Sequence, residues 1–245
     1  MPVRRTYRYG PDPSQVADLH TPAGGSGWPV AVVIHGGFWR ARYDRALMEP
    51  VCADLAARGW AAWNLEYRRT GPGGGGGWPM TFDDVGAGID QLALLDAPID
   101  VGRVVAIGHS AGGHLALWAA SRGQTQVPLH AAVGQAAVTD LAQAAWLRLS
   151  DAAAQDLLGG APADVPERNA AASPVQRLPL GVPSLLVHGA ADDTVPVSFS
   201  LEFHAAAVAA GDACDLVVAE HDGHFEHIDP ASGAWATVTR WLQAL

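Results

Sequence analysis

The chain has 245 residues, of which 49% are hydrophobic, and it carries a formal net charge of −10. This length suits one domain with a sizeable core. The acidic balance offers no clustered Lys and Arg for phosphate groups, so we expect neither nucleic acid nor an anionic membrane as a partner. No apolar run is long enough to cross a bilayer, and Met1–Asp12 lacks the apolar stretch of a secretory signal. We therefore expect a cytoplasmic protein.

Short apolar, β-branched runs alternate along the chain with segments rich in helix formers. The seven predicted strands are Val16–Leu19, Val30–Ile34, Ala61–Glu66, Arg103–Ile107, Ala131–Gln135, Ser184–His188 and Asp215–Ala219. The five predicted helices are Asp44–Arg58, Phe82–Leu95, Ala111–Arg122, Val197–Ala210 and Trp235–Leu245. Such alternation predicts an α/β fold over residues 1–245, with a mostly parallel central sheet and helices on both faces.

A glycine-bearing loop, His35-Gly36-Gly37-Phe38-Trp39, follows the strand predicted at Val30–Ile34. Parallel sheets place their ligand sites in the loops after the strands, and glycine lets the backbone approach a ligand closely. We therefore expect the N–H groups of Gly37 and Phe38 to stabilise a negatively charged oxygen. Trp39 and Tyr67, the latter after the next strand, are candidate pocket residues, although a structural role for Tyr67 is the more common alternative.

The segment Gly108-His109-Ser110-Ala111-Gly112 has the form G-x-S-x-G. A buried-strand pattern precedes it and a helix-forming segment follows it. Strand, sharp turn and helix are the setting in which this motif exposes a serine hydroxyl at the end of a sheet. We predict that Ser110 is a nucleophile and that the N–H of Ala111 is another donor to the oxyanion.

The stretch 138–180 separates two predicted strands by more than a simple crossover. It contains a helical pattern at Leu141–Leu158, then two glycines and a proline-rich run. We expect it to form a small cap-like insertion over the active site rather than a second domain.

Two adjacent aspartates, Asp192 and Asp193, follow the strand predicted at Ser184–His188. A serine nucleophile requires a base, and a carboxylate must fix the tautomer of that base and stabilise its charged form. Either aspartate could supply this carboxylate, and the other would then be a turn residue or a helix cap.

Three histidines, His221, His224 and His227, follow the last predicted strand. His224 stands in Gly-His-Phe, in the loop where a base belongs. The even spacing also suggests a metal site with Asp222 and Glu226 as further ligands. However, neither a second cluster nor the two distant cysteines, Cys52 and Cys214, support that alternative.

Together these motifs resemble the α/β-hydrolase superfamily, in particular the esterase/lipase branch that includes kynurenine formamidases and feruloyl-esterase-like proteins. The matching segments are His35 to Trp39, Glu66 to Arg68, Gly108 to His114, His188 to Pro196 and Gly223 to Phe225. The resemblance implies the α/β-hydrolase fold. It also implies that Asp192, the aspartate of H-G-x-x-D-x-x-V-P, is the triad acid. Phe38 departs from the H-G-G-G loop of hormone-sensitive-lipase-like enzymes, which points towards the formamidase-like side.

The sequence thus predicts a serine hydrolase that cleaves small carboxylic esters through Ser110, His224 and Asp192 and an acyl-enzyme. We expect a small-molecule ester or amide substrate as a partner, and we expect no cofactor or metal. One alternative is an arylformamidase acting on N-formylkynurenine or a similar aryl formamide. Two others are a small-peptide hydrolase and a non-catalytic binding protein with the same fold.

Overall fold

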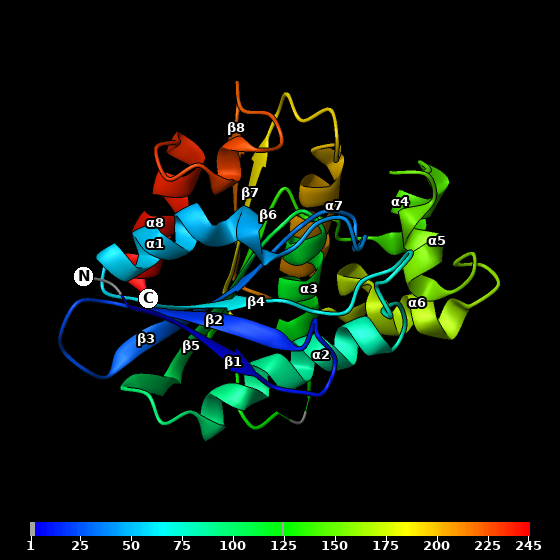
Figure 1. The fold of residues 1–245 in the computed structure, drawn as a ribbon. Helices are drawn as coiled ribbons and strands as arrows, with labels where there is room; N and C mark the ends of the chain where they lie inside the picture. Colours follow the sequence, from blue (N-terminus) through cyan, green and yellow to red (C-terminus); the bar gives the residue numbers. More distant parts are fainter. Residues whose placement is uncertain (1–2, 124) are drawn as a thin grey trace.

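The computed structural model describes residues 3–123 and 125–245, which form one eight-stranded sheet with helices on both faces (Figure 1). The strand order is β1-β2-β4-β3-β5-β6-β7-β8. Strand β2 runs antiparallel to β1 and β4, whereas every pairing from β4 to β8 is parallel. The predicted α/β architecture with a mostly parallel sheet is therefore confirmed.

Seven of the strands coincide with predicted strands to within a few residues. The eight strands are β1 (Val3–Arg8), β2 (Val16–Thr21), β3 (Trp28–Ile34), β4 (Ala61–Leu65), β5 (Ile99–His109), β6 (Ala131–Gln135), β7 (Ser184–Gly189) and β8 (Cys214–Ala219). Strand β1 was not predicted, because this antiparallel edge strand is almost entirely exposed and has no apolar run.

The observed helices differ from the predicted ones chiefly in where they begin, end or are interrupted by a turn. They are α1 (Glu49–Ala57), α2 (Met80–Asp90), α3 (Ala111–Ala120), α4 (Leu141–Trp146), α5 (Ala153–Leu158), α6 (Pro166–Ala172), α7 (Ser198–Ala209) and α8 (Gly233–Ala244). Short 3-10 helices occupy Arg45–Met48, Gln91–Leu94, Pro174–Arg177 and Glu226–Ile228. None of the described helices combines the length and apolar character needed to cross a membrane.

Three helices predicted as continuous are each divided in two. The one expected over Asp44–Arg58 restarts at Glu49, because Pro50 has no N–H to continue the hydrogen-bond ladder. The helical pattern at Leu141–Leu158 is broken between α4 and α5, where Arg148 and residues 150–152 have positive φ. The helix expected over Phe82–Leu95 ends as α2 at Asp90, and a 3-10 turn follows it.

The core lies on both faces of the sheet because successive side chains of a strand point to opposite sides. On β3, Val30, Val32 and Ile34 belong to the cluster that contains α2 and α3. The intervening Ala31 and Val33 pack with α1 and α8 on the other face (Figure 1). Full burial of each valine or isoleucine contributes about 1.5–3 kcal/mol. Packing on both faces of the sheet fixes the carboxyl ends of the strands, which carry the loops of the candidate site.

The segment 138–180 contains α4, α5, α6 and the 3-10 helix at Pro174–Arg177. It lies beside the loop after β3, since the Arg40 guanidinium is 3.1 Å from the Asp156 carboxylate. It also meets the loop before α2, where the N–H of Trp78 donates to the carbonyl of Leu157. Its function as a cap stays a prediction.

Candidate active site

Ser110 lies at a sharp turn between β5 and α3, with φ of 57° and ψ of −119°. A positive φ is unusual for a serine and marks stored backbone strain. The turn is tight: a Cβ on Gly108 would lie 2.0 Å from the carbonyl oxygen of Gly112, and a Cβ on Gly112 would lie 2.0 Å from that of Ile34. Both glycines are therefore required by close packing, and the serine is held at the carboxyl end of the sheet.

Asp192 and His224, from the loops after β7 and β8, form a hydrogen-bonded pair. The Nδ1–H of His224 donates to Oδ2 of Asp192 over 2.7 Å. The other carboxylate oxygen accepts the N–H groups of Thr194 and Val195, both at 2.8 Å. Burial favours the neutral acid, but the hydrogen bonds from His188 and His224 outweigh it and hold the pKa of Asp192 well below its usual range.

The structure distinguishes the two aspartates, Asp192 and Asp193, between which the motif residues alone did not decide. The carboxylate of Asp193 is solvent-accessible and accepts a hydrogen bond from the hydroxyl of Thr194 at 3.2 Å. Asp192 instead has a fully buried side chain that faces the imidazole of His224. This geometry favours Asp192 as the partner of the base.

His188 holds the acid loop in place, a function that the sequence analysis did not assign. Its Nε2–H donates to the carbonyl of Val195 over 2.9 Å and lies 3.3 Å from Oδ2 of Asp192. Its Nδ1 is 2.7 Å from the hydroxyl of Ser200 on α7. The signal was present in the sequence, because His188 opens the H-G-x-x-D segment.

His109, next to the nucleophile, connects the serine turn to the loop that carries His224. Its Nε2–H donates to the backbone carbonyl of His224 over 2.7 Å. Burial, reinforced by the proximity of the His224 imidazole, lowers the pKa of His109 well below its usual value, so the ring is neutral. His109 thereby fixes the position of His224 relative to Ser110.

The remaining histidines of the 221–227 segment do not converge with His224. His221 is exposed, whereas His227 is fully buried. Burial and the neighbouring His188 lower the pKa of His227 to about 4. Among residues 3–123 and 125–245, no three His, Cys, Asp or Glu side chains gather in a way that could hold a metal ion.

The loop after β3 passes directly over the serine turn. A Cβ on Gly36 would lie 3.0 Å from the Cβ of Ser110. Gly37, Phe38 and Trp39 have consecutive positive φ values of 104°, 50° and 56°. At Gly37 a Cβ would come within 2.5 Å of the Tyr43 ring, so only glycine fits there.

The predicted oxyanion donors are not used inside the protein. No hydrogen bond between described residues uses the N–H of Gly37 or Phe38 as its donor. Ala111 is the first residue of α3, where an N–H has no acceptor within the helix. These three N–H groups therefore remain available to a ligand at Ser110.

Ser110 and His224 line one cavity of about 90 Å³. Gly37 and Phe38 contribute to its wall, which is otherwise mainly apolar. The apolar residues of the wall are Tyr43, Leu47, Phe225 and Ile228. Among its lining residues none comes from the segment 138–180.

Trp39 and Tyr67, which we expected beside the pocket, are not among the residues that line this cavity. Both side chains are buried and their polar atoms are satisfied by internal partners. The Trp39 indole donates to Nδ1 of His114 over 3.2 Å, and the Tyr67 hydroxyl donates to the carbonyl of His35 over 2.8 Å. These bonds join Trp39 to α3 and Tyr67 to the loop after β3.

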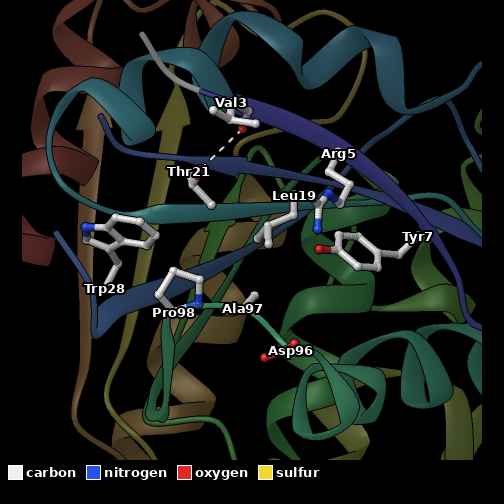
Figure 2. A pocket seen from close by; sticks show the side chains of 9 residues that line it. All are labelled: Val3, Arg5, Tyr7, Leu19, Thr21, Trp28, Asp96, Ala97 and Pro98. Atoms are coloured by element: carbon white, nitrogen blue, oxygen red, sulfur yellow. Dashed lines mark hydrogen bonds between the residues drawn. The ribbon is translucent and has the colours of Figure 1, made fainter. Parts of the chain in front are cut away.

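A second cavity, of about 200 Å³, lies between the β1–β2 edge and residues 96–98. Figure 2 shows the side chains of Arg5, Tyr7 and Trp28 around it. No serine, cysteine or histidine is among its lining residues. Although it is the larger cavity, it therefore offers none of the groups for nucleophilic catalysis that meet at Ser110.

The comparisons with solved structures concern the fold. The fold is similar to a truncated carbohydrate esterase from gut microbiota (TM-score 0.84, 20% identity, covering 98% of this chain and 95% of that one). It is also similar to esterase B from Lactobacillus rhamnosis inhibited by a tributyrin phosphonate (0.83, 23%, 99% and 85%). A third similar structure is the propionate-bound esterase Est2 from Thermogutta terrifontis (0.75, 24%, 98% and 91%). At these identities the likeness establishes the α/β-hydrolase fold.

No curated protein shows significant similarity to the chain in sequence. A family model, BD-FAE, matches residues 17–207. The matched range includes the loop after β3, the serine turn and Asp192, and it ends before His224. The chain belongs to the BD-FAE family, a family of esterase-like α/β-hydrolases.

Proposed function

We propose that this protein is a serine esterase that cleaves small carboxylic esters through Ser110, His224 and Asp192. One observation carries the proposal: Ser110 and His224 line the same cavity, while Asp192 occupies Nδ1 of His224. This bond leaves Nε2, the other ring nitrogen, as the atom that can accept a proton. A strained serine, a base with one free nitrogen and an ionised carboxylate are the components of acyl transfer.

In the proposed mechanism Nε2 of His224 removes the hydroxyl proton of Ser110 as the oxygen attacks the ester carbonyl. The N–H groups of Gly37, Phe38 and Ala111 stabilise the negatively charged oxygen of the tetrahedral intermediate. The imidazolium then gives its proton to the departing alkoxide, and an acyl-enzyme remains. Water, deprotonated by His224, attacks the acyl-enzyme, and collapse of this second intermediate releases the acid and restores Ser110.

The size of the cavity favours a short acyl group. Its volume is about 90 Å³, and one water molecule occupies roughly 30 Å³ in the liquid. The space thus accommodates about three or four non-hydrogen atoms, as in an acetyl or a propionyl group. The apolar wall suits a short hydrocarbon chain. The propionate bound to Est2 and the tributyrin phosphonate bound to esterase B, two proteins of the same fold, support this choice.

The test is hydrolysis of p-nitrophenyl esters with acyl chains of increasing length, beside N-formylkynurenine. We expect kcat/KM to be greatest for acyl chains of two or three carbons and to fall at least about tenfold for eight, because the excess methylenes would not fit the pocket. Ser110→Ala is expected to abolish turnover. Ser26→Ala, in an exposed loop at the opposite end of β3, is the matched control and should retain full activity.

Several outcomes would overturn this proposal. A folded wild-type protein that hydrolyses no ester would favour a binding protein. Preference for N-formylkynurenine over every ester would favour the formamidase, which would use the same residues. Equal turnover by wild type and Ser110→Ala would contradict the serine mechanism for either substrate.

A further inference from the structure

A second histidine–carboxylate pair lies at the start of the loop after β3, which carries the proposed oxyanion donors. The parallel register of β3 and β4 pairs Ile34 with Leu65, so the next residues, His35 and Glu66, emerge side by side. Nε2 of His35 is 2.9 Å from Oε1 of Glu66, and Nδ1 is 2.8 Å from the carbonyl oxygen of Gly36. Both side chains are almost completely buried.

The partners of His35 determine its protonation. The carbonyl of Gly36 can only accept, so Nδ1 must carry a hydrogen. Glu66 already accepts the N–H of Tyr67 at Oε1 and that of Arg45 at Oε2. Burial favours the neutral acid, but the hydrogen bond and charge of His35, together with Arg69, lower the pKa of Glu66 below its ordinary value. An ionised Glu66 requires a hydrogen on Nε2 as well.

The carbonyl of Gly36 and the carboxylate of Glu66 are both satisfied only if each ring nitrogen of His35 carries a hydrogen, which makes the ring an imidazolium ion. Its charge faces the carboxylate of Glu66, and two further cations lie near that carboxylate: Arg69 at 3.4 Å and Arg45 at 4.0 Å. The ring of Tyr67 stacks on the imidazole, with centroids 4.4 Å apart and planes 12° from parallel. The imidazolium thus has an ionic partner, an aromatic face and two hydrogen-bond acceptors.

The bond to Gly36 has a direct consequence for the oxyanion site. In a trans peptide the C=O of one residue and the N–H of the next lie in one plane and point in opposite directions. Holding the Gly36 carbonyl therefore fixes the direction of the Gly37 N–H. We propose that His35, kept doubly protonated by Glu66, is a positioning residue that aims the Gly37 N–H at the oxyanion on Ser110.

The loop requires such a restraint because glycine itself restricts the backbone conformation very little. Gly36 and Gly37 lack a Cβ, and glycine readily adopts backbone conformations that other residues avoid. A neutral His35 could keep only one of its two bonds, and a lone pair on Nδ1 would repel the Gly36 carbonyl. The peptide would then lose its fixed direction. This inference rests on the proposed function, in which the Gly37 N–H stabilises the oxyanion.

The first experiment separates positioning from simple structural support. Glutamine at position 35 carries donors on one nitrogen only, so His35→Gln cannot serve both acceptors. We expect kcat to fall about tenfold to a hundredfold with KM unchanged, because the oxyanion forms only in the transition state. Affinity for a short-chain trifluoromethyl ketone, whose adduct carries the same oxyanion, should fall in parallel.

Asp84→Asn is the matched control for loss of a buried ion pair. Asp84 is 1% exposed and pairs with Arg68 at 2.7 Å, and it does not touch the Gly36–Gly37 peptide. We expect this variant to be less stable but to keep the wild-type kcat and the wild-type affinity for the ketone. A His35→Gln variant that behaves in the same way would overturn the proposal.

The second experiment does not depend on catalysis. In the ¹⁵N-histidine-labelled wild type at about pH 8, where a free imidazole is neutral, we expect both ring nitrogens of His35 to carry protons. The signal is assigned by its absence in His35→Gln. A neutral tautomer would overturn the inference even if ester hydrolysis is confirmed. Conversely, a wild type with the doubly protonated signal but no esterase activity would refute the proposed function alone.

Discussion

Two histidine–carboxylate pairs lie at the carboxyl ends of the strands. They differ in the partner of the imidazole nitrogen that does not bind the carboxylate. In His224–Asp192 the carboxylate binds Nδ1, and His224 lines the cavity at Ser110. In His35–Glu66 the carboxylate binds Nε2, and Nδ1 is committed to the carbonyl of Gly36. The pair distances are nearly equal, 2.7 and 2.9 Å. A histidine bonded to a carboxylate is therefore a base only if its other nitrogen is left for substrate or nucleophile.

The largest expected effect is the loss of kcat on removal of His224, and rescue by added imidazole distinguishes this histidine from His35. His224→Ala should lower kcat by about 10⁴- to 10⁶-fold, because the base is lost. Added imidazole should restore part of this activity, since the space vacated by His224 opens into the cavity at Ser110. His35→Ala should gain nothing from imidazole, because its site is fully buried. Rates with and without imidazole measure the difference. Rescue of the His35 variant, or none for the His224 variant, would contradict the assignment of the base.

Asp192→Asn is expected to lower kcat by about 10⁴-fold, because an amide does not enforce the tautomer that leaves Nε2 free. Asp193→Asn provides the matched comparison, since it changes the adjacent and solvent-accessible carboxylate. Its kcat should stay within about twofold of wild type. Steady-state kinetics on the same ester decide between them, and the reverse ranking would move the acid to Asp193.

Gly37→Ala tests the proposed oxyanion donor, the N–H of Gly37, while both histidines are left unchanged. The new Cβ would lie 2.5 Å from the Tyr43 ring, and φ at this position is +104°. We expect kcat to fall about 10²-fold as the N–H is displaced, together with a loss of about 1–3 kcal/mol of stability from the strained backbone. Kinetics and urea denaturation of the same preparation measure both. An unchanged kcat would exclude the Gly37 N–H as an oxyanion donor.

Another buried histidine, His114, gives the smallest effect and sharpens the contrast with His35. Its Nδ1 accepts from Trp39 while its Nε2–H donates to the carbonyl of Ala172, so one proton satisfies both bonds. Burial lowers the pKa of His114 to about 3. The unfolded chain binds a proton at this residue below pH ~6.5 and the folded chain does not, so the native state loses stability as pH falls from about 6.5 towards 3.

His114→Gln removes that titration while keeping a donor and an acceptor. Between pH 7 and 5 the wild type should lose about 2 kcal/mol more than the variant. Urea denaturation at both pH values measures the free energy of unfolding. Parallel pH dependence of the two proteins would show that His114 is not held neutral.

The sequence predicted the sheet and the candidate triad because both depend on local patterns. The serine motif, the H-G-x-x-D segment and Gly223-His224-Phe225 each follow an apolar run that forms a strand. Strand β1 has no such run, and it was therefore missed.

The partners of the residues that support the site could not be predicted, for a different reason. The His35–Glu66 pair depends on the register between β3 and β4, and the bond from His109 to the His224 carbonyl spans 115 positions. For Trp39 and Tyr67, composition cannot tell whether an aromatic side chain faces a cavity or packs behind its wall.

The most direct test of the central claim is covalent labelling with diethyl p-nitrophenyl phosphate, followed by mass spectrometry of the digested protein. The reagent should transfer one diethylphosphoryl group to Ser110 and release one equivalent of p-nitrophenolate per chain. Ester hydrolysis should be lost in proportion to labelling, and Ser110→Ala should not be labelled. Full esterase activity in a protein labelled completely at Ser110, or stoichiometric labelling at another residue, would contradict the account.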